Sequence, residues 1–229
     1  MRLNLFITAI TPGIALGLAL YFFDRHDKEP LKMLLKVFFL GVLSVIPTIL
    51  VENILSGLNI FPGIFGVAFT AFIVAGFTEE YMKRMVVIKT VYFNPVFDEK
   101  LDGIIYCSFS ALGFATIENI MYVVFRFSDV ESIGLFRAIL SVPAHMLFAV
   151  TMGYYMSLAK FAATPQASRY YLKKSLTIPM ILHGIFDFIL MSQNNMLMLL
   201  FIPFVVYLWV VNLRKLNVYY KDSKKQNEL

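Results

Sequence analysis

Three observations predict an all-α polytopic membrane protein with about seven transmembrane helices. Hydrophobic residues make up 59% of the chain and the mean hydropathy is +0.73, values that a soluble domain of 229 residues rarely reaches. Several apolar runs approach about 20 residues, the length at which a helix crosses the hydrocarbon core. The charged residues gather between these runs, as anchors and topology signals do, so the net charge of +5 does not indicate a nucleic-acid partner.

The apolar runs give the elements in order. The first run lacks a small-residue cleavage pattern before Tyr21, so we expect an uncleaved first helix and not a signal peptide. The expected spans are residues 3–23, 33–54, 62–92, 102–125, 138–159, 175–191 and 196–213. We expect one integral membrane domain over residues 1–213 and a basic cytoplasmic tail over residues 214–229. Cys107 is the only cysteine, which excludes an intrachain disulfide.

The distribution of positive charge predicts the orientation. Seventeen of the 20 Lys and Arg residues lie on the side that holds the C-terminus, and only Arg2, Arg126 and Arg137 lie on the other side. Because positive residues are retained in the cytoplasm, we expect an extracytoplasmic N-terminus and a cytoplasmic C-terminus. The protein is therefore expected to be a multi-pass protein of the cell membrane, with the lipid bilayer as its surroundings.

The third span is expected to be interrupted or re-entrant. If residues 62–78 crossed the membrane alone, Glu79 and Glu80 would reach the cytoplasmic face, far from the other buried charges. If Phe61–Gly76 instead enters from outside as a broken segment, Thr78–Phe93 can continue to the cytoplasm. Irregular backbone is tolerated at membrane depth where protein or a cavity covers it. We prefer this second path, because it brings all the buried charges to a similar depth.

Ionisable residues inside the apolar runs are the candidate functional residues. A charge at membrane depth costs a few kcal/mol on insertion scales, so such groups pair, line a wet cavity or take part in chemistry. The candidate catalytic residues are Glu79, Glu80, Glu118, His145, His183 and Asp187, with Lys83 and Asn119 as charge or substrate support. Two imidazoles and several carboxylates are enough to build one buried hydrolytic site.

The acidic pair and Lys83 share a helix face. Lys83 follows Glu79 by four residues and Glu80 by three, so it can keep one carboxylate ionised while the other takes a proton from water. The simpler interpretation is a charged helix start near the interface, with Thr78 as its cap.

The remaining candidates also have structural interpretations. Glu118 could be a structural carboxylate bonded to a hydroxyl such as that of Ser141 or Thr151, and His145 could be a structural histidine. His183 and Asp187 lie four residues apart, so the carboxylate can fix the tautomer of the imidazole. The same pair could also be only a hydrogen-bonded pair within a helix.

Two chemistries remain open for this group. Two histidines and a glutamate suit a divalent metal such as zinc, with Glu118, His145 and His183 as the candidate ligands. The same residues could activate water without a metal, and the His-Glu-x-x-His zinc pattern is absent. Serine catalysis is disfavoured, because no Gly-x-Ser-x-Gly elbow occurs.

The order of these motifs resembles the PrsW family of bacterial intramembrane proteases. The resemblance extends along nearly the whole chain and also includes the loop Asp27-Lys28-Glu29-Pro30 and the segment Asp102–Tyr106. The motifs that carry it are Glu79-Glu80-x-x-Lys83, Phe114-x-x-x-Glu118, His145 and His183-x-x-x-Asp187. The related CAAX-prenyl endopeptidase and bacteriocin-processing group often has histidine at the position of Glu118, and this departure favours PrsW.

The resemblance implies a function. PrsW proteins make the first, extracytoplasmic-side cut in a single-span anti-sigma factor, after which other proteases free the sigma factor. We therefore expect an intramembrane endopeptidase whose partner is a single-span membrane protein. The main rival is a proton-coupled transporter or channel that uses the Glu and His residues as a relay, although no internal repeat is evident. A second rival is a scaffold in which buried polar groups only hold helices together.

Overall fold

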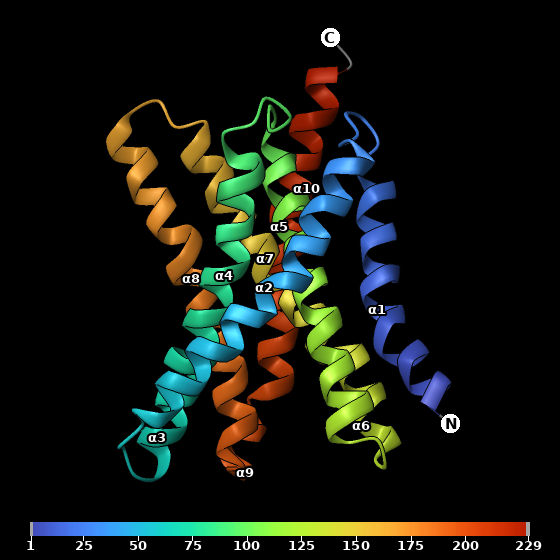
Figure 1. Cartoon of the computed structure of the whole chain (residues 1–229). Helices are drawn as coiled ribbons and strands as arrows, with labels where there is room; N and C mark the ends of the chain where they lie inside the picture. Colours follow the sequence, from blue (N-terminus) through green and yellow to red (C-terminus); the bar gives the residue numbers. More distant parts are fainter. Residues whose placement is uncertain (1, 228–229) are drawn as a thin grey trace.

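The computed structural model describes residues 2–227, and this part of the chain is helical throughout, with no β-strand. Seven of its helical segments are long and apolar enough to cross a membrane, so the protein is a multi-pass membrane protein (Figure 1). These segments are Leu3–Phe23, Leu31–Gly57, Gly63–Tyr92, Lys100–Arg126, Ser132–Lys160, Pro165–Ser192 and Asn195–Gln226. The predicted fold class and the approximate positions of all seven spans are confirmed.

The helical segments follow one another with short loops between the spans. The α-helices are α1 (Arg2–Phe23), α2 (Leu31–Gly57), α3 (Gly63–Phe69), α4 (Thr78–Val87), α5 (Lys100–Ile120), α6 (Glu131–Phe136), α7 (Val142–Lys160), α8 (Pro165–Ser192), α9 (Asn195–Met198) and α10 (Phe201–Asn227). Four π-helical segments complete the spans: η1 (Thr70–Phe77), η2 (Ile88–Tyr92), η3 (Met121–Arg126) and η4 (Arg137–Ser141).

The third span is interrupted but not re-entrant. Helix α3 leads into the π-helical segment η1, and η1 leads into α4 without a loop, because Phe69 and Phe77 both keep right-handed helical dihedrals. The interruption is therefore a change of hydrogen-bond register just before Glu79, and π segments are often found at functional sites. Thr78 is not a helix cap, so the simpler interpretation of the acidic pair, as a capped helix start, is wrong. Thr78 lies inside the helix, and its hydroxyl donates to the Ile73 carbonyl at 3.3 Å.

The last span is longer than the sequence predicts. Helix α10 continues through the polar segment that we expected to be a tail, because one face of that segment packs on the bundle. Tyr219 is buried and stacks on Tyr154 of α7, with ring centroids 4.9 Å apart. Lys215 donates to the Thr151 hydroxyl at 2.6 Å. Residues 228–229 lie outside the described part of the chain, and the boundary between domain and tail stays a prediction.

Helices α5 and α7 form the centre of the bundle. They approach closely where glycines face each other: a Cβ atom added to Gly153 would lie 2.2 Å from the Gly103 carbonyl oxygen. Small residues allow such close packing of helices in a membrane, where apolar surface alone does not drive association. Helices α1, α2, α4, α8 and α10 surround this pair. Large apolar side chains on α1 and α2, such as Leu18 and Leu50, are exposed and suit contact with lipid.

The bundle has two distinct ends (Figure 1). The end that holds the N-terminus also holds the end of α2, the start of α3, and the short helices α6 and α9. The opposite end holds the C-terminus and the loops at residues 24–30, 93–99 and 161–164. We call these the N-terminal end and the C-terminal end. The motif residues lie between the two ends, so the fold brings segments far apart in the sequence to one depth.

Candidate active site

Four helices bring the motif residues together inside the bundle. Helix α4 carries Glu79, Glu80 and Lys83, helix α5 carries Glu118 and Asn119, helix α7 carries His145, and helix α8 carries His183 and Asp187. Glu80 and Lys83 are fully buried, and the side chains of Glu118 and Asp187 are the most accessible, at 16% and 18%. The convergence that we expected from the sequence is therefore present, and all eight residues are in or beside this cluster.

Lys83 lies at the centre of the cluster. Its ammonium donates to Glu79 Oε2 at 3.0 Å and to Glu80 Oε1 at 2.9 Å, and it lies 2.9 Å from His145 Nδ1. The ring of Phe114 covers the ammonium, with Nζ 4.3 Å from the ring centroid. Because an ammonium has no acceptor, Nδ1 of His145 must accept this hydrogen bond, and the ring proton is on Nε2. Lys83 thus offsets the cost of burying two carboxylates and fixes the tautomer of His145.

Each of the two histidines has a ring nitrogen within hydrogen-bond distance of a carboxylate. His145 Nε2 lies 3.0 Å from Glu118 Oε2, and His183 Nδ1 lies 2.9 Å from Glu80 Oε1. His183 Nε2 also lies 3.4 Å from Asp187 Oδ2, one helical turn further along α8. Carboxylates in these positions fix the orientation of the rings. Among the described residues, the hydrogen bonds of the two rings involve no serine.

Arg137 is a member of the cluster that sequence reasoning missed. Its Nη2 lies 2.9 Å from Glu118 Oε2, and its Nε donates to Asn119 Oδ1 at 2.9 Å. Asn119 in turn donates to the Ala9 carbonyl at 2.9 Å, so it links the arginine to α1. The suggested partners of Glu118, Ser141 and Thr151, are wrong, because Arg137 and His145 hold this carboxylate. An arginine at the end of an apolar run looks like a topology anchor in the sequence.

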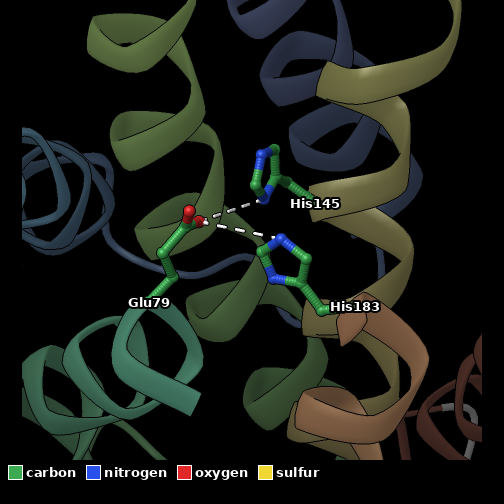
Figure 2. Close-up of side chains that lie close together, drawn as sticks. All are labelled: Glu79, His145 and His183. Atoms are coloured by element: carbon green, nitrogen blue, oxygen red, sulfur yellow. Dashed lines mark ion pairs between the residues drawn. The ribbon is translucent and has the colours of Figure 1, made fainter. Parts of the chain in front are cut away.

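Glu79, His145 and His183 form a group that could hold a metal ion (Figure 2). Their side chains point toward one another from α4, α7 and α8. Glu79 Oε2 lies 3.9 Å from His145 Nδ1 and 4.0 Å from His183 Nε2, and the three donor atoms lie within 4.8 Å of one another. The carboxylate of this group is Glu79 and not Glu118, which was the candidate ligand from the sequence.

The cluster opens onto a cavity of about 730 Å³. The walls come from α2, η1 with α4, α5 with η3, η4 with α7, and α8. The motif residues on its lining are Glu79, Glu118, His145, His183 and Asp187, whereas Glu80 and Lys83 lie behind them. The lining also includes Ser56, Arg126 and Met191, which lie toward the N-terminal end of the bundle. The arrangement combines acids, imidazoles and space for water, which are the requirements of hydrolysis.

The chain is similar to known proteins along most of its length. Residues 29–212 match the family described as "PrsW family intramembrane metalloprotease". A Protease PrsW of Clostridioides difficile (strain 630) is 43% identical over 229 residues, which cover 98% of this chain and 95% of the relative. The Protease PrsW of Bacillus subtilis (strain 168) is 41% identical, with 90% and 91% covered, and that of Geobacillus kaustophilus is 38% identical, with 93% and 90% covered. No solved structure matches the chain significantly.

These matches decide between the functions that the sequence left open. They span nearly the whole chain, and all of the relatives named above are proteases, so neither a transporter nor a scaffold is needed to account for the buried charges. The chain therefore belongs to the PrsW family of intramembrane metalloproteases, and it is a multi-pass membrane protease that acts on peptide bonds.

Proposed function

We propose that the protein cleaves a single-span membrane protein near the extracytoplasmic face, as the first (site-1) cut in an anti-sigma factor. The observation that carries the proposal is that five ionisable motif side chains line one cavity together. Positive residues favour the C-terminal end in the cytoplasm, which leaves the N-terminal end extracytoplasmic. Cavity-lining residues such as Ser56 and Arg126 lie near that end, so substrate and water have a route from outside. The anti-sigma substrate rests on the resemblance to the family.

In this proposal the two adjacent acids have different tasks. Glu79 lines the cavity, so its carboxylate acts at the water molecule that attacks the scissile carbonyl. Glu80 is fully buried and is not itself part of the cavity lining, and it holds Lys83 and His183 in position. Its second oxygen, Oε2, has no hydrogen-bond partner among the described residues. The pair therefore divides into one residue for chemistry and one for orientation.

The histidines complete the proposed machinery. His145 and His183 line the cavity, and both rings face the Glu79 carboxylate (Figure 2). In a site without a metal, Nε2 of His183 can donate a hydrogen bond to the oxyanion and a proton to the leaving amine. Glu118 and Asp187 orient these rings through the contacts described above. Arg137, Asn119 and Lys83 maintain the charge balance and geometry of the carboxylates.

The donor set of Glu79, His145 and His183 fits a divalent metal, and we propose zinc; with zinc bound, these three side chains would serve as its ligands and not as the base and acid described above. Two imidazole nitrogens and one carboxylate oxygen are the ligands of many catalytic zinc sites, and Glu118 and Glu80 contact the outer ring nitrogens as supporting carboxylates usually do. A bound zinc ion would lower the pKa of a water molecule and polarise the scissile carbonyl. Lys83 Nζ contacts two of the three donor atoms, so the ammonium and a metal compete for them.

Cleavage by purified protein tests the proposal. A single-span reporter in proteoliposomes should be cut by the wild type, and Glu79→Gln and Glu80→Gln should each lose at least about 100-fold in rate. Asp129→Asn, which changes an exposed acid near the N-terminal end, is the matched control and should cut normally. If both glutamine variants cut at near-normal rates, the assignment of the acidic pair is refuted.

Metal content provides a test that does not depend on cleavage. Wild-type protein purified without chelator should retain about one zinc ion per chain by elemental analysis. His145→Ala and His183→Ala should lose it, because each removes one of three protein ligands. If both variants retain the wild-type metal content, the ligand assignment is wrong, whatever the cleavage assay shows.

Reporter fusions test the orientation. Fusions after Asn59, Ser128 and Asn194 should report an extracytoplasmic location, and fusions after Lys28, Pro165 and Lys224 a cytoplasmic one. The reversed pattern would place the cavity mouth on the cytoplasmic side and would exclude a cut near the extracytoplasmic face.

A further inference from the structure

Glu52 of α2 is a carboxylate on the cavity lining that the proposed machinery does not use. It is half-buried, and none of the hydrogen bonds and ion pairs among the described residues includes it. The other acids on the lining, Glu79, Glu118 and Asp187, all contact a lysine, an arginine or a histidine. Glu52 precedes the end of α2 by five residues, or roughly 8 Å of helix, which is inside the membrane span. An ionisable group at that depth is costly unless it has a partner or a function.

The cations around the cavity are already engaged elsewhere. Lys83 contacts Glu79 and Glu80, and Arg137 contacts Glu118. Arg126 lies over the rings of Tyr122 and Phe127, with its guanidinium carbon 5.3 Å from each centroid. The charges whose fields reach Glu52 are Glu79 and Glu118, which repel it, and Lys83 and His183, which are bound to other acids. The cavity therefore has a carboxyl group that no cation of the described residues engages.

Helix α2 presents different faces to the cavity and to its surroundings. The face with Thr48, Glu52 and Ser56 lines the cavity. The opposite face carries exposed apolar side chains, including Ile46, Leu50 and Ile54, that suit lipid. In Figure 1, α2 diverges from the lower part of α5 toward the N-terminal end, and both contribute to the cavity lining. A substrate helix that reaches the cavity between them would pass Glu52 before it reached Glu79.

We propose that Glu52 is a specificity-determining residue that binds a Lys or Arg side chain of the substrate span, close to the scissile bond. The inference rests on the proposed active site and names the feature of the substrate that this site selects. A basic side chain in the outer part of a span can extend along the helix and place its charge in the wet cavity. There it would form a charge-assisted hydrogen bond with a carboxylate that has no other partner. A hydrogen bond of this kind contributes about 1.5–3 kcal/mol, or about 10- to 150-fold in affinity.

Binding and cleavage of designed peptides test this inference. The probes are single-span peptides of about 20 Leu and Ala residues with one Lys, Gln or Glu, placed at successive positions in the half of the span nearest the extracytoplasmic face. Binding is measured by fluorescence anisotropy in nanodiscs, with Glu80→Gln as the background so that no peptide is cut. The variants added to this background are Glu52→Gln and Glu52→Lys, with Asp129→Asn as the matched acid control. Cleavage of the same peptides is measured with Glu80 restored.

The expected result is a preference that depends on residue 52. At one or two adjacent positions, the Lys peptide should bind at least about 10-fold more tightly than the Gln and Glu peptides. Glu52→Gln should remove this preference, Glu52→Lys should transfer it to the Glu peptide, and Asp129→Asn should leave it unchanged. In cleavage, the ratio of kcat/KM between the Lys and Gln peptides should change in the same way.

Other results would overturn the inference. Equal binding of the three peptides at every position, with Glu52 or without it, would show that residue 52 selects no charge. An equal loss of kcat on all peptides in Glu52→Gln, with the binding preference unchanged, would place Glu52 in the catalytic machinery. The binding measurement does not depend on cleavage. If the proposed function is wrong but the inference on Glu52 holds, the peptides will bind with the expected preference and the wild type will cut none of them.

Discussion

The cluster around Lys83 and a second group of buried acids near the C-terminal end differ in what offsets the burial of their carboxylates. The second group consists of Asp24 and Glu29 in the loop after α1, Glu99 before α5, and Asp102 in the first turn of α5, and all four are buried. Around Lys83, carboxylates contact an ammonium, a guanidinium and two imidazoles. In the second group, no lysine or arginine of the described residues forms an ion pair with the acids.

Proton sharing takes the place of ion pairing in the second group. Glu29 and Asp102 are close enough for their charges to interact, and two buried carboxyl groups that face each other are favoured when one of them carries a proton. The Tyr106 hydroxyl also donates to Glu29, and Asp102 accepts from the backbone of Asp98 and Glu99. Burial raises the pKa of Glu29 to about 7, and that of Glu99 to about 8. The comparison indicates two ways to bury acids. The carboxylates around Lys83, where chemistry requires a base, are paired with cations, whereas the carboxyl groups of the second group, which only connect a loop to α5, share protons.

Removal of the central cation should have the largest effect on stability. Lys83→Met retains a long side chain but leaves Glu79 and Glu80 without a counter-ion, which typically costs about 3–5 kcal/mol for a buried pair. Thermal unfolding in detergent should therefore show a much lower melting temperature. Lys89→Met, on the exposed face of the same span, is the matched control and should change stability by less than about 0.5 kcal/mol. If both variants melt like the wild type, the cluster does not depend on this cation.

The second prediction separates a group that touches the substrate from a group that orients it. His183→Ala should reduce kcat/KM by at least about 100-fold, because the ring lines the cavity. Asp187→Ala should cost about 10- to 100-fold, mainly in kcat, because the carboxylate acts through the ring. Asp187→Glu, which keeps the charge, should recover part of the loss. Wild-type kinetics in His183→Ala, or a larger loss in Asp187→Ala, would reverse the assigned roles.

Much of this architecture was predictable because it depends on local signals. The length of each apolar run determines a span, and an ionisable residue inside a run indicates a functional site wherever the run goes. The spacing of Glu79, Glu80 and Lys83 predicted that they share a face, and both ion pairs are present. The spacing of His183 and Asp187 predicted their contact in the same way.

The rest depends on contacts between helices, which no local signal contains. Arg137 of η4 reaches Glu118 of α5 only because the folded bundle brings the two side chains together, and a single arginine at the edge of a span has the same appearance as an anchor. The π-helical register of η1 is a choice of hydrogen-bond partner that apolar side chains do not specify. Glu52 was missed because it has no motif partner, and its position on the cavity lining emerges only from the packing of five segments around it.

The smallest expected effect concerns the second acid group, where stability should depend on pH near neutrality. Burial raises the pKa of Asp24 to about 6, and that of Glu29 to about 7, from ordinary values of 3.8 and 4.5. A raised folded-state pKa means that the folded protein binds the proton more tightly than the unfolded chain. The resulting stability is complete below about pH 4 and is lost as the pH rises from there through about 6 to 7. The groups that face Glu29 are Asp24, Asp98, Asp102 and Tyr106, and Lys28 acts on Asp24.

Glu29→Gln should flatten this dependence, because the amide is neutral at every pH. Melting temperatures measured from pH 5.5 to 8.5 should fall in the wild type, and the fall should be smaller in Glu29→Gln by about 2–4 °C, the shift that corresponds to about 1 kcal/mol. Asp27→Asn, an exposed acid in the same loop, should follow the wild type. Cleavage by Glu29→Gln at a fixed pH should stay within about twofold of wild type, because the residue lies outside the cavity lining. Identical pH profiles for Glu29→Gln and wild type would show that the second group, like the cluster around Lys83, keeps its carboxylates charged, and the contrast between the two groups would disappear.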